Sequence, residues 1–143
     1  MKLPGGGKMA YTTCMNGKIN VEKQVAYWCK GGREDWTVGV DLVKRGRVRH
    51  GMFFVHLALE KTLKAHVCKA TRDFAPKIHS LIRLLELSTL DASEEQRDTL
   101  AKLTRFNLAG RYPDSLEPQV TKRFAMEEVA SARKVYLWLR NQF

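Results

Sequence analysis

The chain has 143 residues, 44% of them hydrophobic and 28% charged, which is the composition of one globular domain with a core of its own. No apolar run approaches the roughly 20 residues of a membrane helix, and residues 1–15 lack the apolar stretch of a secretory signal. We therefore expect a cytoplasmic protein with no membrane partner. The formal charge of +10 favours acidic partners, of which nucleic acid is the commonest, although a basic surface can also serve only to keep a small protein in solution.

Residues 1–20 are predicted to form a tail, because Pro4 and the three glycines after it disfavour both helix and strand. A first helix is predicted over residues 21–45. Asn20 is a favourable N-cap, apolar residues then recur with a helical period, and Gly46 ends the pattern. Two adjacent glycines in the middle of this helix each cost roughly 1 kcal/mol relative to alanine, so we expect the helix to be weakened or kinked there.

A second helix is predicted over residues 47–69, with apolar side chains almost all round its axis. Such a helix in a globular protein is the central one, buried on several sides. It also carries His56, Glu60 and Lys64 at the spacing i, i+4, i+8, which places the three on one face. This stripe has two interpretations, a row of salt bridges on the surface or the polar lining of a cleft.

The second half of the chain predicts three more helices. The first is short and covers residues 79–87. A capping box, in which Ser93 is followed by Gln96, begins the next helix, which extends to about Gly110. After a turn that contains a proline, the last helix covers residues 121–141. No segment alternates in the manner of a strand, so the predicted fold class is all-α, an up-and-down bundle of four longer helices plus one short helix.

Sequence patterns that indicate cofactors or metals are absent. The chain has no Walker A loop, no GxGxxG after a strand, no HExxH and no GxSxG elbow. Its three cysteines, Cys14, Cys29 and Cys68, are odd in number and have no CxxC spacing, which predicts reduced thiols. We therefore expect no cofactor and no metal site.

Four short motifs, in order along the chain, carry a resemblance to a known family. The string Phe54–Ala65, FVHLALEKTLKA, resembles the second-helix signature A-x-EK-x-LKA of the HEPN family. His79–Leu81 is similar to the H-D-L element of that family, and Arg111–Asp114 matches its RYPD turn before the final helix. Trp28 and Asp35-Trp36 lie where the first helix of the family has YW and DL. The order and spacing of these elements agree over most of the chain.

The resemblance implies a helical-bundle domain over residues 21–143 that forms a homodimer. Many members of the family are encoded beside a minimal nucleotidyltransferase, often as the toxin half of a toxin–antitoxin pair. Many are metal-independent RNases with an Arg-x(4–6)-His pair in the C-terminal half, and others lack that pair and bind nucleotide or RNA without cutting it. His79 is the last histidine of this chain, so none follows Arg111 to complete the pair. The matches Arg45–His50 and Arg72–His79 lie well before the usual position.

Metal-free RNA cleavage needs a base for the 2′-hydroxyl proton and a cation for the charged phosphorane. The catalytic candidates are His79 and Arg111. His79 has an alternative role as a helix-start residue bonded to backbone, and Arg111 as a helix-end cation that pairs with Asp114 or faces the helix dipole. Tyr112 either stacks on a base or packs in the core.

The same region predicts a binding site. Arg111 offers phosphate a two-pronged guanidinium, and Asp114 would orient that group rather than touch the ligand. We expect one polar cleft that receives phosphate, formed by Lys61, Lys64, His79, Arg111, Tyr112 and Asp114.

Three functions follow from this reasoning, and the sequence leaves open whether the protein is an enzyme. The favoured one is a homodimeric module that binds nucleotide or RNA, acting with a minimal nucleotidyltransferase partner in a toxin–antitoxin-type pair. The second is a metal-independent RNase toxin that uses His79 with Arg111 or Arg72. The third is a structural helical dimer whose basic surface has no specific ligand.

Overall fold

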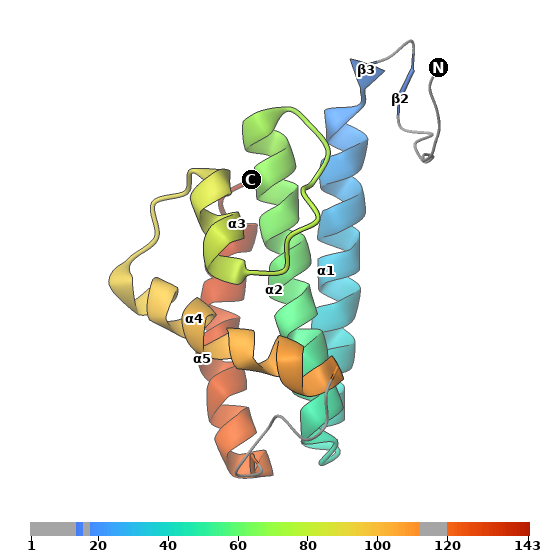
Figure 1. The fold of residues 1–143 in the computed structure, drawn as a ribbon. Coiled ribbons are helices and arrows are strands. Elements are labelled where there is room, and N and C mark those ends of the chain that lie inside the picture. Colours follow the sequence, from blue (N-terminus) through green and yellow to red (C-terminus); the bar gives the residue numbers. More distant parts are fainter. Residues whose placement is uncertain (1–13, 16–17, 112–119) are drawn as a thin grey trace.

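The computed structural model describes residues 14–15, 18–111 and 120–143, and these form a bundle of α-helices (Figure 1). The helices are α1 Val21–Lys44, α2 Val48–Thr71, α3 Leu81–Ser88, α4 Glu94–Arg111 and α5 Lys122–Arg140. Four are long and α3 is short, which confirms the predicted fold class. Before α1, the two-residue strands β2 Cys14–Met15 and β3 Lys18–Ile19 pair antiparallel inside the segment predicted as a tail. None of the described helices is long and apolar enough to cross a membrane.

Helix α1 begins and ends close to the residues that the sequence predicts. Asn20 Oδ1 accepts a hydrogen bond from the backbone N–H three residues later, at 3.0 Å, which satisfies a donor that the helix start leaves unpaired. Gly46, just after the helix, has a φ of 85°, a left-handed conformation that glycine adopts without strain. The helix runs unbroken through Gly31 and Gly32. Gly32 instead provides space, because a Cβ there would lie 2.6 Å from Thr62 Oγ1 on α2.

Helices α1 and α2 come into close backbone contact at two facing glycines. A Cβ on Gly39 would lie 2.8 Å from the backbone N of Val55 and 2.9 Å from the carbonyl oxygen of Gly51. A Cβ on Gly51 would lie 2.8 Å from the carbonyl oxygen of Gly39 and 2.5 Å from Val43 Cγ2. These distances to backbone are shorter than real Cβ contacts, so the two helix backbones touch here because neither residue has a side chain.

Helix α2 lies at the centre of the bundle and packs against each of the other four helices. Its side chains are buried on nearly all sides, as its apolar composition predicts, and Met52, Val55, Leu59 and Leu63 have no exposed surface. Because burial of each such side chain removes apolar area from water, this helix holds the greatest share of the stabilising core.

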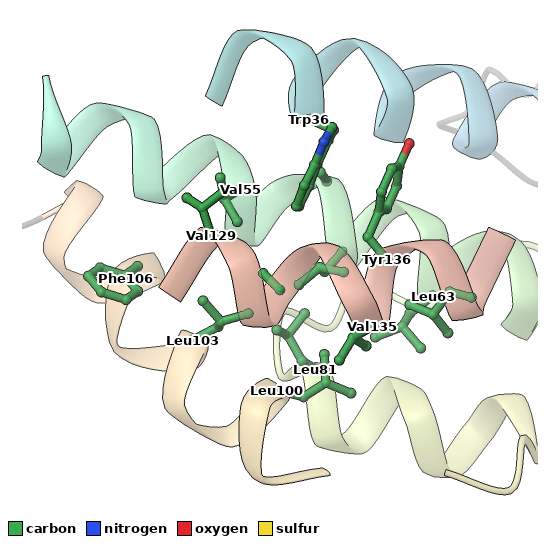
Figure 2. Packing of buried hydrophobic residues seen from close by; sticks show 14 of the residues in the cluster. Trp36, Val55, Leu63, Leu81, Leu100, Leu103, Phe106, Val129, Val135 and Tyr136 are labelled. Carbon is green, nitrogen blue, oxygen red and sulfur yellow. The ribbon is translucent and has the colours of Figure 1, made fainter. Parts of the chain in front are cut away.

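The remaining helices complete the core around α2 (Figure 2). Trp36 of α1 and Tyr136 of α5 stack with ring centroids 4.6 Å apart and an interplanar angle of 10°. Helix α4 contributes Leu100, Leu103 and Phe106, all without exposed surface, to the same cluster. The first and last helices of the bundle are therefore joined through side chains as well as through α2.

Residues 72–80 connect α2 to α3 and run back along α2 (Figure 1). Helix α3 begins at Leu81, two residues later than predicted, because Ser80 Oγ accepts the backbone N–H of the third residue beyond it at 3.2 Å and acts as the N-cap. The predicted capping box before α4 is present, with Ser93 N donating to Gln96 Oε1 at 2.8 Å and Gln96 N to Ser93 Oγ at 3.1 Å.

Candidate functional site

The polar stripe of α2 meets the connection between α2 and α3 at one buried carboxylate. Glu60 Oε2 lies 3.2 Å from Lys64 Nζ, one turn later on α2, and 3.1 Å from His79 Nδ1, which the returning chain supplies. His56 Nδ1 lies 3.7 Å from Glu60 Oε1 on the other side. The Glu60 side chain is 4% exposed and that of Lys64 7%, whereas His79 is 53% exposed. We call these four residues the Glu60 cluster.

The burial of this stripe excludes one of the two interpretations that the sequence left open. The surface interpretation is wrong, because the His56 side chain has no exposed surface and Glu60 is covered. A buried charge is costly unless it is paired and hydrogen-bonded, and Glu60 meets this condition at Oε2, which faces both Lys64 and His79. The Lys64 ammonium also lies 5.2 Å from the centroid of the Trp28 ring, a cation–π distance that helps to hold it inside the bundle.

Lys61 has a different partner from Lys64. Its Nζ lies 2.8 Å from Asp35 Oδ2 on α1, so the pair bridges the first two helices. Its aliphatic chain covers Gly31, where a Cβ would lie 3.1 Å from Lys61 Cδ. Both lysines predicted to receive phosphate thus already have carboxylate partners, and the positive charge that each offers to a ligand is reduced.

The remaining predicted site residues follow α4. Arg111 is the last residue of that helix, and its side chain lies outside the described part of the structure. Tyr112 and Asp114 also lie outside the described residues. The structure therefore brings Lys64 and His79 together at Glu60. Lys61, on the same helix as Lys64, pairs with Asp35 instead. The contribution of the Arg111–Asp114 turn stays a prediction.

The geometry of His79 suits proton transfer or the binding of an anion. Its Nδ1–H donates to the Glu60 carboxylate, which fixes the orientation of the ring and leaves Nε2 as the available nitrogen. Arg72, one of the two arginines proposed to assist it, has its guanidinium 3.8 Å from Glu22 of α1. No group of three or more potential metal ligands occurs among the described residues.

A second feature, which sequence reasoning missed, is a cavity between α1, α2 and α5. It has a volume of about 280 Å³ and is lined by Val25, Cys29, Arg33, Thr62, Tyr136, Arg140 and Phe143. The sequence does contain the residues that form the cavity: Cys29 and Arg33 are one helical turn apart, and so are Tyr136 and Arg140. This spacing places each pair on one face of its own helix. It does not indicate that the two helices lie side by side, so the cavity could not be predicted from it.

Burial and the two arginines act in opposite directions on the titrating groups of this cavity. Burial raises the pKa of the Cys29 thiol, and the charges of Arg33 and Arg140 lower it by a smaller amount. Burial likewise raises the pKa of Tyr136, which the same two guanidiniums also oppose. The charges of Arg33 on α1 and Arg140 on α5 therefore both influence the titration of Cys29 and of Tyr136 in this cavity.

Comparison with known proteins agrees with the motifs and the bundle. The HEPN domain model matches residues 25–142. The fold is similar to the crystal structure of TT1696 from Thermus thermophilus, with a TM-score of 0.71 and 20% identity over 84% of this chain and 98% of that one. It is also similar to ST0689, an archaeal HEPN homologue, with a TM-score of 0.64 and 20% identity over 82% of this chain and 96% of the other. No curated protein sequence matches. The chain belongs to the HEPN domain family.

Proposed function

We propose that this HEPN-domain protein binds nucleotide or RNA as a homodimer. Its partner would be a minimal nucleotidyltransferase, in a toxin–antitoxin-type pair in the cytoplasm. The observation that carries the binding proposal is the Glu60 cluster, a buried carboxylate that orients the half-exposed imidazole of His79. The basic character of the chain, with a formal charge of +10, supports an anionic ligand.

The position of His79 at the start of α3 adds to this argument. It directly precedes the N-cap Ser80, so its backbone adjoins the first turn of α3, at the positive end of the helix dipole. Backbone N–H groups at a helix start favour an anion, so a phosphate held by His79 Nε2 would gain if it also reached this turn. Lys64 is held by Glu60, and its role in the proposal is to offset the charge of that carboxylate rather than to contact the ligand.

RNA binding tests this proposal directly. We expect the fluorescence anisotropy of a labelled single-stranded RNA to rise on titration with protein, and the affinity to fall with salt concentration as lysines and arginines release counterions. His79→Ala should weaken binding about tenfold, equivalent to about 1.4 kcal/mol. Arg111→Lys keeps the charge and removes the two-pronged donor, so a similar loss is expected there.

The matched control is His50→Ala, because His50 is an exposed histidine near the start of α2, beside a cluster of arginines and Lys44. It should leave the affinity within about twofold. If His50→Ala weakens binding and His79→Ala does not, the RNA site lies at the α1–α2 turn and the Glu60 cluster is structural. An absence of salt-dependent binding would favour the third alternative, a structural helical dimer without a specific ligand.

A second candidate function, a metal-independent RNase, is favoured by the Glu60–His79 pair itself. An imidazole held by a carboxylate can accept the 2′-hydroxyl proton, and a nearby guanidinium would stabilise the phosphorane. Cleavage of RNA in the presence of EDTA that is lost in His79→Gln would establish this activity. Intact RNA after incubation with a protein that demonstrably binds it would leave the binding function alone.

A further inference from the structure

The cavity between α1, α2 and α5 differs from the Glu60 cluster in how its cations are paired. Lys61 and Lys64 each lie within 3.2 Å of a carboxylate oxygen. Arg33 and Arg140 line the cavity, and no salt bridge within the described residues involves either of them. No acidic residue lies among the described side chains of its walls. Within the described residues, neither guanidinium is therefore paired with a carboxylate side chain.

The two arginines reach the cavity from helices that lie side by side. Arg33 belongs to α1 and Arg140 to the last turn of α5, and these helices are in contact. The carbonyl oxygens at the end of α5 would oppose an anion, but the backbone N–H of Asn141 and the ring of His66 donate to several of them. The helix end is therefore capped, which reduces the repulsion that its carbonyl oxygens would exert on an anion.

Neutral groups between the arginines can complete an anion site. The Arg140 guanidinium lies 5.7 Å from the centroid of the Tyr136 ring, a cation–π distance, and its charge opposes the burial that raises the pKa of the Tyr136 hydroxyl. Arg140 is thus held at the wall of the cavity. Thr62 donates its hydroxyl proton to the carbonyl of Ala58 at 2.8 Å, so Thr62 has no proton left to give a ligand. The donors available to an anion are the two guanidiniums and the tyrosine hydroxyl.

The size of the cavity limits the class of ligand. Its volume is about 280 Å³, far above the roughly 30 Å³ that one water occupies in the liquid, and just below the roughly 300 Å³ of the smallest drug-sized pockets. A halide or free phosphate would leave most of it unfilled. Val25 and Phe143 provide apolar surface in the same cavity, which suits the carbon skeleton of a small ester.

We propose that this cavity binds a small organic phosphate monoester, with its phosphate between Arg33 and Arg140 and its organic part against Val25 and Phe143. Two guanidiniums suit phosphate because each presents paired N–H donors to its oxygens. The site is distinct from the Glu60 cluster. Thr62 and Glu60 are two residues apart on α2, about 200° around the helix axis, so they face different sides of it.

Titration calorimetry with four probes tests the ligand class. Ribose 5-phosphate and 5′-AMP should each bind with a saturable signal, inorganic phosphate more weakly, and adenosine not at all. Stronger binding of 5′-AMP than of ribose 5-phosphate would identify a nucleotide as the monoester, and equal binding a sugar phosphate. Absence of saturable binding by both esters, or binding of adenosine as strong as that of 5′-AMP, would overturn the proposal.

Substitution of the arginines tests the position of the phosphate. Arg33→Gln and Arg140→Gln should each weaken the bound ester at least about tenfold, or about 1.4 kcal/mol. Arg97→Gln is the matched control, since Arg97 is an exposed arginine of α4 that does not line the cavity, and it should change the affinity less than about twofold. An equal loss in all three variants would show non-specific charge attraction and overturn the proposal.

Protection of a thiol provides a readout in the unaltered protein. Cys29 lines the cavity, so the bound ester should slow its alkylation by iodoacetamide, measured by peptide mass at mildly alkaline pH. Cys68 is an internal reference, because it is buried and burial raises its pKa to about 11. Unchanged alkylation of Cys29 at saturating ester would overturn the assignment.

Two substitutions separate the ester site from the proposed RNA site. Arg33→Gln should leave the affinity for RNA unchanged, and His79→Ala should leave the affinity for the ester unchanged. Failure of the ester proposal can therefore be distinguished from failure of the RNA-binding proposal.

Discussion

At the scale of single residues, Leu63 shows how closely the core can be tested. Its side chain has no exposed surface on the central helix α2. Leu63→Ala removes buried methyl groups and leaves a cavity, so we expect the free energy of unfolding to fall by about 2–5 kcal/mol. Urea unfolding followed by circular dichroism measures this value. A loss below about 1 kcal/mol would mean that α2 is not the centre of the core.

His66 gives a second prediction at this scale, through pH. Burial lowers the pKa of His66 below its ordinary 6.5, the hydrogen bond to the Leu139 carbonyl opposes this shift, and Lys69 adds to it. The unfolded chain therefore binds the proton at a pH where the folded chain does not. The contribution of His66 to stability is fully present above about pH 6.5 and is lost as the pH falls through the folded-state pKa.

Unfolding by urea across a pH series measures that dependence. The free energy of unfolding should decline on acidification, and the decline should be smaller in His66→Asn, whose amide can still donate to the Leu139 carbonyl. His66 Nε2 lies 2.7 Å from that oxygen in the native protein. Identical slopes for the two proteins would assign the acid sensitivity to groups other than His66.

The sequence predicts individual residues well where the responsible chemistry is local. The spacing of His56, Glu60 and Lys64 places them on one face of α2, as the structure confirms. Their burial could not be predicted, because it depends on the path of residues 72–80 and on the arrival of His79 at Glu60. A contact between residues 19 positions apart in the chain leaves no periodic signal in the sequence.

At the scale of helices, the glycines of α1 differ from one another in a testable way. A Cβ on Gly39 would meet backbone atoms of α2 at 2.8–2.9 Å, whereas one on Gly31 would meet only the flexible chain of Lys61 at 3.1 Å. Gly39→Ala should therefore lower the free energy of unfolding by roughly 1–3 kcal/mol. Gly31→Ala should be neutral or stabilising by up to about 1 kcal/mol, because alanine favours helix.

Thermal and urea unfolding of the two variants side by side distinguish packing from helix propensity. Both substitutions add the same methyl group to the same helix, so each serves as the control for the other. Equal stability of the two variants would show that α1 and α2 can separate at Gly39 without loss. From the sequence alone, only the lower helix propensity of glycine could be predicted. A glycine that is required because two helices approach closely cannot be distinguished in the sequence from a glycine that merely weakens its helix.

Helix boundaries were predictable to within about two residues, because caps are local. Asn20, the Ser93–Gln96 box and Thr121 all form side-chain hydrogen bonds that begin helices near the expected positions. The cavity between α1, α2 and α5 was not predictable. Its walls come from three helices, and their relative placement is determined by the whole core.

At the scale of the whole molecule, we expect a homodimer. Six large hydrophobic side chains are at least 37% exposed within the described residues: Tyr27, Val38, Phe74, Phe124, Leu137 and Phe143. A second copy of the chain would remove part of this apolar surface from water. Sedimentation velocity over a range of micromolar concentrations should show the dimer mass. A monomer at every concentration would contradict this prediction.

The stack of Trp36 on Tyr136 has a consequence for the order of events during synthesis. Trp36 lies on α1 and Tyr136 on α5, which are the first and the last in chain order of the five described helices. A nascent chain that ends before α5 lacks the ring that covers this indole in the finished protein, and the core beside it stays incomplete. Domains generally fold as units, so we expect the Trp36 side chain to move from solvent into the core only after α5 has emerged from the ribosome. Its emission wavelength, followed in a Trp28→Phe, Trp138→Phe background, would report that moment.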